Sequence, residues 1–573
     1  MVMRVVRWLG RWAGTGLWVA VLAPALALLP AAVLDRGPGG AVRPTLLPLA
    51  LAALDPFLWD CARNSVVVAV VVASGSLVLG TGLARAGVRW RFWGRPVLGA
   101  LLLAPLAVPP LFGAIGLRWL AAPAFASPGT GGGAWLAPGS LAGWLGWVWV
   151  GLASGVPLVA LATSSALLRV DPAWEDAARL AGARPRRIWR QLVWPVARPG
   201  AARAAGMVFA LTLADPGAPL AFGLRRTLSF QIVEASLGPE PAPRAAVLAL
   251  AAAALALIGR VLVRWWGGTP VAGPEIAEVP VARAELARWP RVAGYVATLG
   301  IGAVLAWLPV VALLATALAA TGGGPDDPAA SGLRRLADEE SRRLLGNSLA
   351  LGLAVVAIDL ALAWTLAAWA GRRHAWVLSL AAWPELLTPL TLGVGALVLP
   401  GLLHMGADWA RAGDTRIALA RGLQMLAGGL DPYRTPGVLL VLAVAAARLP
   451  FLARSVEHGW SRFRPALVDA ASTLGATPRQ ARRTATGLWL GAAPAALVLT
   501  FALAATNLAP ALVLAPTVES RPIAPGILIL ADEPGLALDR AADLACVAVA
   551  VNLAALALAA TSRSVRLGDW FRG

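Results

Sequence analysis

Long apolar runs, separated by short charged loops, dominate the chain. Runs of about 20 residues with almost no charge recur along it, and a helix needs about 20 apolar residues to cross the hydrocarbon core of a membrane. A helix also satisfies its backbone hydrogen bonds internally, as lipid requires. The alternating pattern that a membrane barrel would need is absent from the sequence. The pattern therefore predicts an all-α polytopic membrane protein.

About twelve transmembrane helices are predicted, six in each of two tandem halves. The predicted spans are 14–34, 65–84, 96–118, 141–168, 200–222, 246–264, 292–318, 347–370, 375–402, 436–454, 488–514 and 541–561. An even number of spans places both termini on one side, and the Arg residues that follow the last span favour the cytoplasm. The basic N-terminus could also begin a signal peptide, but its apolar run is long for one. We favour a first span.

Three segments follow from this arrangement. Residues 1–264 form the first half, with a charged loop at about 169–198. Residues 265–291 are rich in Pro, Gly and charge and are interpreted as a cytoplasmic linker. Residues 292–573 form the second half, with its charged loop at about 456–487.

Composition supports a membrane protein and excludes two function classes. Of 573 residues, 58% are hydrophobic and 14% are charged, whereas soluble domains carry about 25% charged residues. The net charge of +19 lies mostly in short loops, as expected of cytoplasmic loops rather than of a nucleic-acid-binding surface. The chain contains no Lys, so it cannot form a standard P-loop, whose Lys holds phosphate. Any ATP-driven step would need a partner.

Two Arg-rich loops repeat each other. Residues 171–190 and 464–483 are identical at ten of twenty positions when they are offset by 293. The matches include charged, Gly and Pro positions, which do not coincide easily by chance in an Ala-rich chain. A weaker repeat is the Asn-Ser pair before the second span of each half, at 64–65 and 347–348. These matches indicate tandem halves, an arrangement common in transporters.

Each loop is predicted to form a helix–turn–helix on the cytoplasmic side. Asp-Ala-Ala, at 176–178 and at 469–471, would begin a short helix because Ala favours helix. Gly182 and Gly475 would end it at positive φ. Pro185 and Pro478 would begin a second short helix. The small residues would leave room for another protein to dock closely.

This pattern resembles the EAA loop of binding-protein-dependent ABC importer permeases, with Asp in place of Glu. In that family the loop inserts into the ATPase subunit and couples its closure to the membrane. The resemblance implies this role for Asp176, Ala177, Ala178, Gly182, Pro195, Asp469, Ala470, Ala471 and Gly475. The second loop departs from the pattern, because Leu488 stands where the first loop has Pro195.

The same resemblance implies the partners. An ATPase dimer would bind on the cytoplasmic side and hold ATP and Mg, and a periplasmic substrate-binding protein would deliver the substrate. The chain itself would bind lipid, no nucleic acid, no metal and no cofactor, and it would have no catalytic residue. It would lie in the bacterial inner membrane with both termini in the cytoplasm.

Two fused six-span halves are similar to the iron(III) and thiamine permeases. Residues 213–219, Leu-Ala-Asp-Pro-Gly-Ala-Pro, and the later Phe-Gln-Ile at 230–232 are similar to iron(III)-type signatures. The second half adds Asn507, Ala509-Pro510 and Arg521-Pro522. Iron(III) is the favoured substrate, with thiamine, phosphonate and polyamine as alternatives.

Acidic and amide side chains near the spans are candidates for the translocation path, because charges are costly there. They are Asp215, Glu385 and Asn507, with Asp359 as a further acidic residue. The competing interpretation places them at span ends or as caps of broken helices. An ion-driven secondary transporter would need paired acidic residues in both halves, but only Thr506 or Asn507 stands opposite Asp215. A membrane enzyme would need a catalytic cluster, and the sequence offers none.

Overall fold

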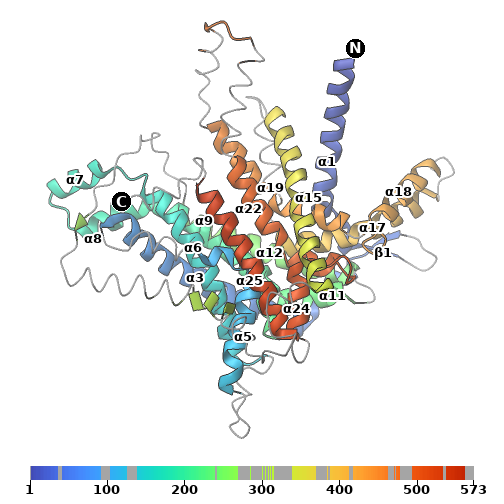
Figure 1. The fold of residues 1–573 in the computed structure, drawn as a ribbon, viewed down its shortest axis with the longest axis horizontal. Coiled ribbons are helices and arrows are strands. Elements are labelled where there is room, and N and C mark those ends of the chain that lie inside the picture. Colours follow the sequence, from blue (N-terminus) through green and yellow to red (C-terminus); the bar gives the residue numbers. More distant parts are fainter. Residues whose placement is uncertain are drawn as a thin grey trace. The chain divides into compact units, whose positions relative to one another are not determined.

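The computed structural model is built almost entirely of helices (Figure 1). It describes residues 2–36, 42–91, 104–125, 139–238, 242–268, 284–285, 338–369, 387–411, 417–435, 437–461, 473–477, 493–532 and 537–561, with single residues between 300 and 314 and at 384, 470 and 480. Eight helical stretches in these ranges are long and apolar enough to cross a membrane. The predicted all-α polytopic membrane protein is confirmed.

The eight candidate spans overlap eight predicted ones, and Pro389–Arg411 begins and ends later than the predicted span 375–402. They are Thr15–Val33, Pro56–Arg89, Leu141–Leu167, Pro185–Ala221, Pro243–Gly267, Glu339–Ala363, Pro389–Arg411 and Arg540–Ala559. Two shorter apolar helices, Val438–Pro450 and Ala496–Ala505, fall on the predicted spans 436–454 and 488–514. The predicted span 292–318 lies mostly outside the described residues, and 96–118 lies partly outside them.

Two predicted spans differ from the structure because each is broken rather than continuous. The span predicted at 200–222 is helix α9 (Trp194–Ala214) followed by the short helix α10 (Gly217–Ala221). The span predicted at 488–514 is likewise α22 (Ala493–Ala505) followed by α23 (Ala509–Leu514). Each break lies beside a Pro near the start of the short helix, where a missing N–H costs nothing.

The chain forms two compact units, each assembled from separate stretches of sequence. One unit contains residues 1–59, 231–253 and 333–566, and the other contains 60–230, 254–332 and 567–573. These units group residues by their contacts and are not the sequence halves predicted at 1–264 and 292–573. The boundary between the halves stays a prediction. Helix α3 (Pro56–Arg89) and helix α12 (Ala242–Gly267) each contribute residues to both units.

The remaining elements are short or belong to one unit. The helices are α1 (Val2–Val33), α2 (Leu47–Leu54), η2 (Ala104–Ala107), α5 (Pro110–Phe125), α6 (Leu141–Leu167), α7 (Pro172–Leu180), α8 (Pro185–Ile188), η4 (Trp189–Val193), α11 (Leu228–Ser236), α15 (Glu339–Trp369), α17 (Pro389–Arg411), α18 (Ile417–Gly429), α19 (Val438–Ser461), α24 (Ile523–Asp532) and α25 (Ala537–Thr561). Strands β1 (Leu34–Arg36) and β2 (Val42–Pro44) pair antiparallel. Strands β3 (Trp90–Arg91) and β4 (Ala284–Glu285) pair parallel.

Small residues let α3 and α6 pack closely in the unit that contains residues 60–230. A Cβ added at Gly75 would lie 2.8 Å from Leu152 Cδ2, and one added at Gly80 would lie 2.9 Å from the Val156 carbonyl oxygen. Small residues are the usual means by which membrane helices approach one another. The close α3–α6 pair forms the base on which the Arg-rich loop rests.

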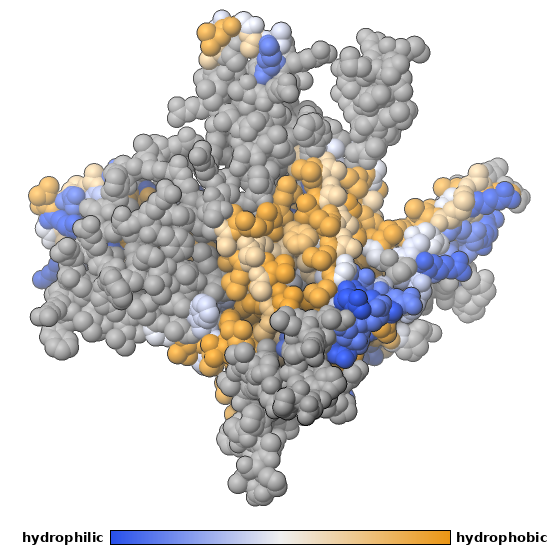
Figure 2. Space-filling view, in the orientation of Figure 1, coloured by the Kyte–Doolittle hydropathy of each residue, from blue (hydrophilic) through white to orange (hydrophobic). Residues whose placement is uncertain are grey.

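In the unit that contains residues 333–566, α15 packs against α19 and α22. A Cβ added at Gly352 of α15 would lie 2.8 Å from the ring of Phe501 in α22. Large apolar side chains of α15 and α25 are exposed, including Leu353 and Leu558. Figure 2 shows a hydrophobic surface in the region where Figure 1 places α15 and α25. Such a surface is expected where lipid, rather than water, covers the protein.

The Asn-Ser repeat seen in the sequence forms the same hydrogen bonds twice. Ser65 Oγ accepts the backbone N–H of Leu228 at 2.9 Å, at the start of α11. Ser348 Oγ accepts that of Ile523 at 2.8 Å, at the start of α24. The preceding Asn also donates to a backbone carbonyl in both places. The two halves therefore share local structure as well as sequence.

Candidate functional site

The first Arg-rich loop begins with helix α7. The Asp171 side chain accepts the backbone N–H of Ala173 at 2.8 Å and caps the helix, and Pro172 follows at its first position. The predicted start is therefore wrong by four residues, because Asp176-Ala177-Ala178 lie in the second half of α7 rather than at its beginning. The cap and the Pro fix the start, whereas Ala only favours continuation.

Helix α7 ends at Gly182, which has the positive φ predicted for it, at 78°. The N–H of Ala183 donates to the carbonyl of Ala178 at 3.0 Å, and that of Gly182 donates to Arg179 at 2.9 Å. This pair of bonds is a Schellman motif, which satisfies the last carbonyls of a helix and needs a left-handed residue. The chain then reverses into α8.

The second helix of the loop is not separate from the membrane helix. Helix α8 runs through the π-helical turn η4 into α9, so that Pro185–Ala214 is one continuous helical stretch. Pro195 lies within the first turn of α9 and is exposed. A π-helical turn is rare and occurs frequently at functional sites.

The outer surface of this helix–turn–helix is exposed and carries an apolar tip. Leu180 is 90% exposed, and Asp176, Ala177 and Gly182 are exposed beside it. Arg184, Arg186, Arg187 and Arg190 are exposed around them. The space beside Gly182 is open, because a Cβ added there would meet no atom within 4 Å. The tip can accept a close-fitting partner.

The inner surface of the loop packs on the membrane helices. Ile188, Val193 and Ala197 join a buried cluster with Leu83 and Val88 of α3. The cluster also contains Ala84, Val156, Ala160, Leu167 and Val170. The loop is thus attached to α3 and α6 by buried apolar contacts, which are the main source of its stability.

Two Arg side chains at the end of α3 also hold the loop, and the sequence analysis did not identify them. Arg89 forms an ion pair with Glu175 of α7. Arg85 places its guanidinium 4.3 Å from the centroid of the Trp189 ring in η4. The spacing of these residues in the sequence could have identified them, because two Arg four residues apart at the end of a span lie on one face of a helix.

The second loop has a comparable turn where the structure describes it. The N–H of Leu474 donates to Ala470 at 3.0 Å, and Gly475 has the predicted positive φ, at 83°. Leu474 is 87% exposed. Thr477 and Gln480 form a capping box: Gln480 Oε1 accepts the N–H of Thr477 at 2.8 Å. Asp469 and Ala471 lie outside the described residues.

A comparison with known protein families identifies part of the chain. Residues 76–267 match the family model of the binding-protein-dependent transport system inner membrane component. This match supports an ABC import permease, and the matched range contains the whole first loop with α3 from residue 76 to its end. Permeases of this kind work with an ATPase and a binding protein. A search of curated proteins gave no match.

Of the residues predicted to line a translocation path, Asp215 caps a short helix. Its two carboxylate oxygens accept the backbone N–H groups of Gly217 and Ala218, at 3.2 and 3.3 Å, at the start of α10. It therefore caps the broken helix, as the competing interpretation expected. Asn507 is 6% exposed at the equivalent break of the second half, and its amide nitrogen is buried without a hydrogen-bond partner among the described residues. Glu385 lies outside the described residues.

Two buried ionisable side chains lie near each other in the helices of the second half. Asp359 of α15 is fully buried, and its charged neighbour is Arg448 of α19. Arg448 donates to the Leu503 carbonyl of α22 at 2.9 Å, whereas the carboxylate oxygens of Asp359 have no hydrogen-bond partner among the described residues. Helices α15, α19 and α22 thus meet at two ionisable groups that do not form a direct ion pair.

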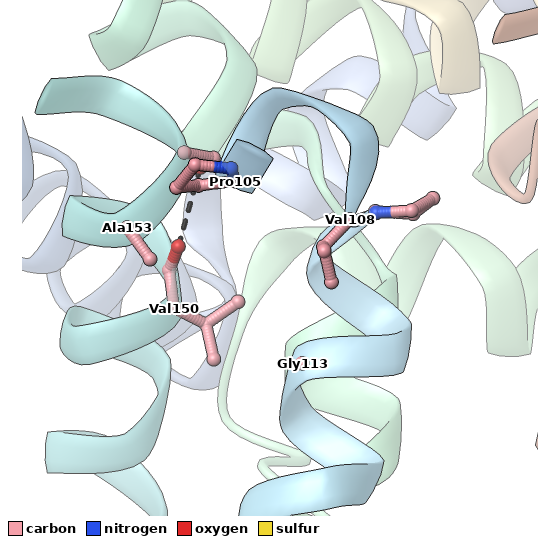
Figure 3. Close-up of a pocket in the computed structure, with 7 residues that line it drawn as sticks. Pro105, Val108, Gly113, Val150 and Ala153 are labelled. Carbon is pink, nitrogen blue, oxygen red and sulfur yellow. Dashed lines mark hydrogen bonds between the residues drawn. The ribbon is translucent and has the colours of Figure 1, made fainter. Parts of the chain in front are cut away.

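A small hollow lies between η2, α5 and α6 (Figure 3). Val108, Gly113, Val150 and Ala153 line it. The Ser154 hydroxyl at its wall donates to the Val150 carbonyl at 3.2 Å. This lining is apolar and does not suit an ion. No group of three His, Cys, Asp or Glu side chains able to hold a metal occurs in the described part of the chain.

Proposed function

We propose that this chain is the membrane permease of an ATP-driven importer in the bacterial inner membrane, with both termini in the cytoplasm. The observation that carries the proposal is the exposed turn at Gly182. It has small residues, an apolar tip at Leu180, and buried attachments to α3, and it lies in the range that matches the permease family model. Such a turn can receive a partner and pass its motion to the membrane.

In the proposed mechanism, one ATPase subunit docks on each Arg-rich loop. ATP and Mg are held by these subunits, and this chain performs no covalent chemistry. Closure of the ATPases moves the loops, and the membrane helices switch the path between the two sides. The residues in contact with the ATPases would be Asp176, Ala177, Ala178, Gly182 and Pro195 in the first loop, and Asp469, Ala470, Ala471 and Gly475 in the second.

We propose iron(III) as the substrate, delivered by a periplasmic binding protein. The support is the Leu-Ala-Asp-Pro-Gly-Ala-Pro segment at 213–219 and the fused halves. Asp215 serves there as a helix cap, so specificity would reside mainly in the binding protein. Thiamine, phosphonate or polyamine remain the alternative substrates within the same function.

An ion-driven transporter would use buried acidic residues in both halves. Counting from the Asn-Ser repeat, Ser76 stands at the position equivalent to Asp359, so this carboxylate has no acidic counterpart. We therefore favour the ATP-driven importer.

Co-purification from the native membrane in mild detergent tests the proposal. We expect an ATPase with a P-loop and a binding protein to accompany the tagged chain, and the ligand of that binding protein to name the substrate. Recovery of the chain alone, under conditions that preserve other membrane complexes, would overturn the proposal.

Substitution at the turns tests where the ATPase docks. Gly182→Trp with Gly475→Trp should abolish co-purification of the ATPase, because the bulky ring occupies the exposed tip. Gly182→Asn with Gly475→Asn should retain it, since Asn tolerates positive φ. Gly422→Trp is the control, because Gly422 of α18 is exposed, with nothing within 4 Å of an added Cβ. Normal ATPase binding by the double Trp variant would contradict the docking role.

A further inference from the structure

The end of α3 contacts both helices of the first loop. Arg85 and Arg89 lie one helical turn apart. Arg89 pairs with Glu175 in α7, and Arg85 lies over Trp189 in η4. One face of a membrane helix therefore touches the helix before the turn and the helix after it.

The Arg89–Glu175 pair differs from the other ion pairs of the loop in its burial. The side chains of Arg89 and Glu175 are 13% and 11% exposed. Those of Arg179 and Asp176, which pair at 3.0 Å on the outer surface, are 59% and 61% exposed. An exposed pair is screened by water and contributes little. A buried pair must stay together, because separation leaves a charge without its partner in a poorly hydrated place.

The second half has different residues at most of the positions that form these contacts. With the register of the Asn-Ser repeat and of the Arg-rich loops, Ala368 replaces Arg85, Val468 replaces Glu175 and Arg482 replaces Trp189. Only the equivalent of Arg89 is kept, as Arg372. The second half therefore lacks the residues that would form the equivalent ion pair and the equivalent contact between Arg and an aromatic ring.

We propose that the Arg89–Glu175 pair joins the first loop to α3, so that the two move as one body when the ATPase closes, and that Glu175 is a positioning residue for this coupling. The proposal rests on the coupling role of the loop given above. Asp176 and Leu180 lie on the exposed surface, whereas Glu175 lies on the buried one. Glu175 thus acts mainly through α3, and its other carboxylate oxygen lies 3.8 Å from Nη2 of the exposed Arg179.

A distance measurement across the joint tests the proposal. Spin labels are placed on α3 at Gly82→Cys and on α7 at Ala173→Cys, two exposed positions, after replacement of Cys61 and Cys546 by Ala. The labelled full chain, in complex with its ATPase in lipid nanodiscs, is measured without nucleotide and with ATP and orthovanadate. We expect one narrow distance distribution that is the same in both states.

Glu175→Gln should loosen α7 from the end of α3, while the apolar contacts of the second helix keep the loop in place. We expect the distance distribution to shift or broaden with ATP and orthovanadate, while the ATPase still co-purifies in normal amount. Glu339→Gln is the matched control, since it removes an exposed carboxylate that pairs with Arg343 at 3.1 Å, and it should behave as the unchanged chain. The charge-swapped chain, Arg89→Glu with Glu175→Arg, should restore the narrow distribution.

The outcomes separate this inference from the proposed function. If no ATPase accompanies the unchanged chain, the proposed function fails. If the ATPase binds but the distance changes with ATP in the unchanged chain, or stays fixed in Glu175→Gln, the joint is wrong. If Glu175→Gln does not accumulate, the charge-swapped chain decides: a narrow, nucleotide-independent distribution supports the pair, and a broad one overturns it.

Discussion

The two Arg-rich loops are alike at their turns and differ in the residues around them. Gly182 and Gly475 both have positive φ, and each has an exposed Leu one or two residues before it. Glu175 of the first loop pairs with Arg89 at the end of a membrane helix, and the aligned position of the second loop is Val468. The described part of the second loop has a Thr-Gln capping box, where the first loop has Arg184 and Arg187. The turn is needed by the backbone in both copies, whereas the residues around it have diverged.

The two halves also differ at equivalent positions within their long helices. At equivalent positions, the first half has Ser76 and Gly155, and the second half has Asp359 and Arg448. The Gly allows close contact between α3, α6 and α9, because an added Cβ would lie 2.5 Å from Ser76 Oγ and 2.7 Å from Val208 Cγ1. The same place in the second half contains two buried ionisable side chains. The first half therefore has close packing where the second half has ionisable groups.

The largest expected effect is at Asp359 and Arg448. Arg448→Met removes the charged neighbour of the buried Asp359 and the hydrogen bond to the Leu503 carbonyl, and we expect a loss of about 3 kcal/mol in the free energy of unfolding. Asp359→Asn combined with Arg448→Met should recover most of it. Thermal unfolding of the purified chain in detergent measures both. Arg343→Met, at an exposed pair, should cost less than about 1 kcal/mol. Equal unfolding temperatures for the single and double variants would show that Asp359 and Arg448 do not interact.

A medium effect is expected at the closely packed position of the first half. Gly155→Ala forces Ser76 or Val208 to move, and we expect a loss of about 1–3 kcal/mol from overpacking. Ser76→Ala removes the hydroxyl that the added Cβ at residue 155 would meet. The double variant Gly155→Ala with Ser76→Ala should therefore lose less stability than the sum of the losses of the two single variants. Gly82→Ala is the control, because an added Cβ there meets nothing within 4 Å. A Gly155→Ala chain as stable as the Gly82→Ala chain would show that the helices are not in close contact.

The smallest effect sharpens the likeness of the halves. Asn347 donates to two carbonyls, of Glu519 at 2.7 Å and Arg521 at 3.0 Å, whereas Asn64 donates to Arg226 at 3.2 Å. Each bond contributes about 0.5–1.5 kcal/mol, so Asn347→Ala should destabilise the chain more than Asn64→Ala. The same thermal unfolding assay compares them. The opposite order would contradict the inference that the second hydrogen bond of Asn347 adds stability.

Much of the fold and part of the candidate site follow from sequence. The apolar runs predicted the spans, because the membrane acts on a helix mainly through its length and hydropathy. The two Gly residues predicted the turns, because positive φ is a property of a single residue and its neighbours. The start of α7 was missed, since Asp171 and Pro172 define it more strongly than the Ala residues that follow.

The sequence by itself determined that this is a helical membrane protein with two related loops, each ended by a left-handed Gly. Only the tertiary structure decided that Glu175 meets Arg89, that Asp359 has Arg448 as its charged neighbour, and that Asp215 caps a broken helix. The physical reason is the range of the interactions. Spans and turns depend on residues close together in the chain, whereas contacts between helices depend on how each helix is rotated and packed against the others.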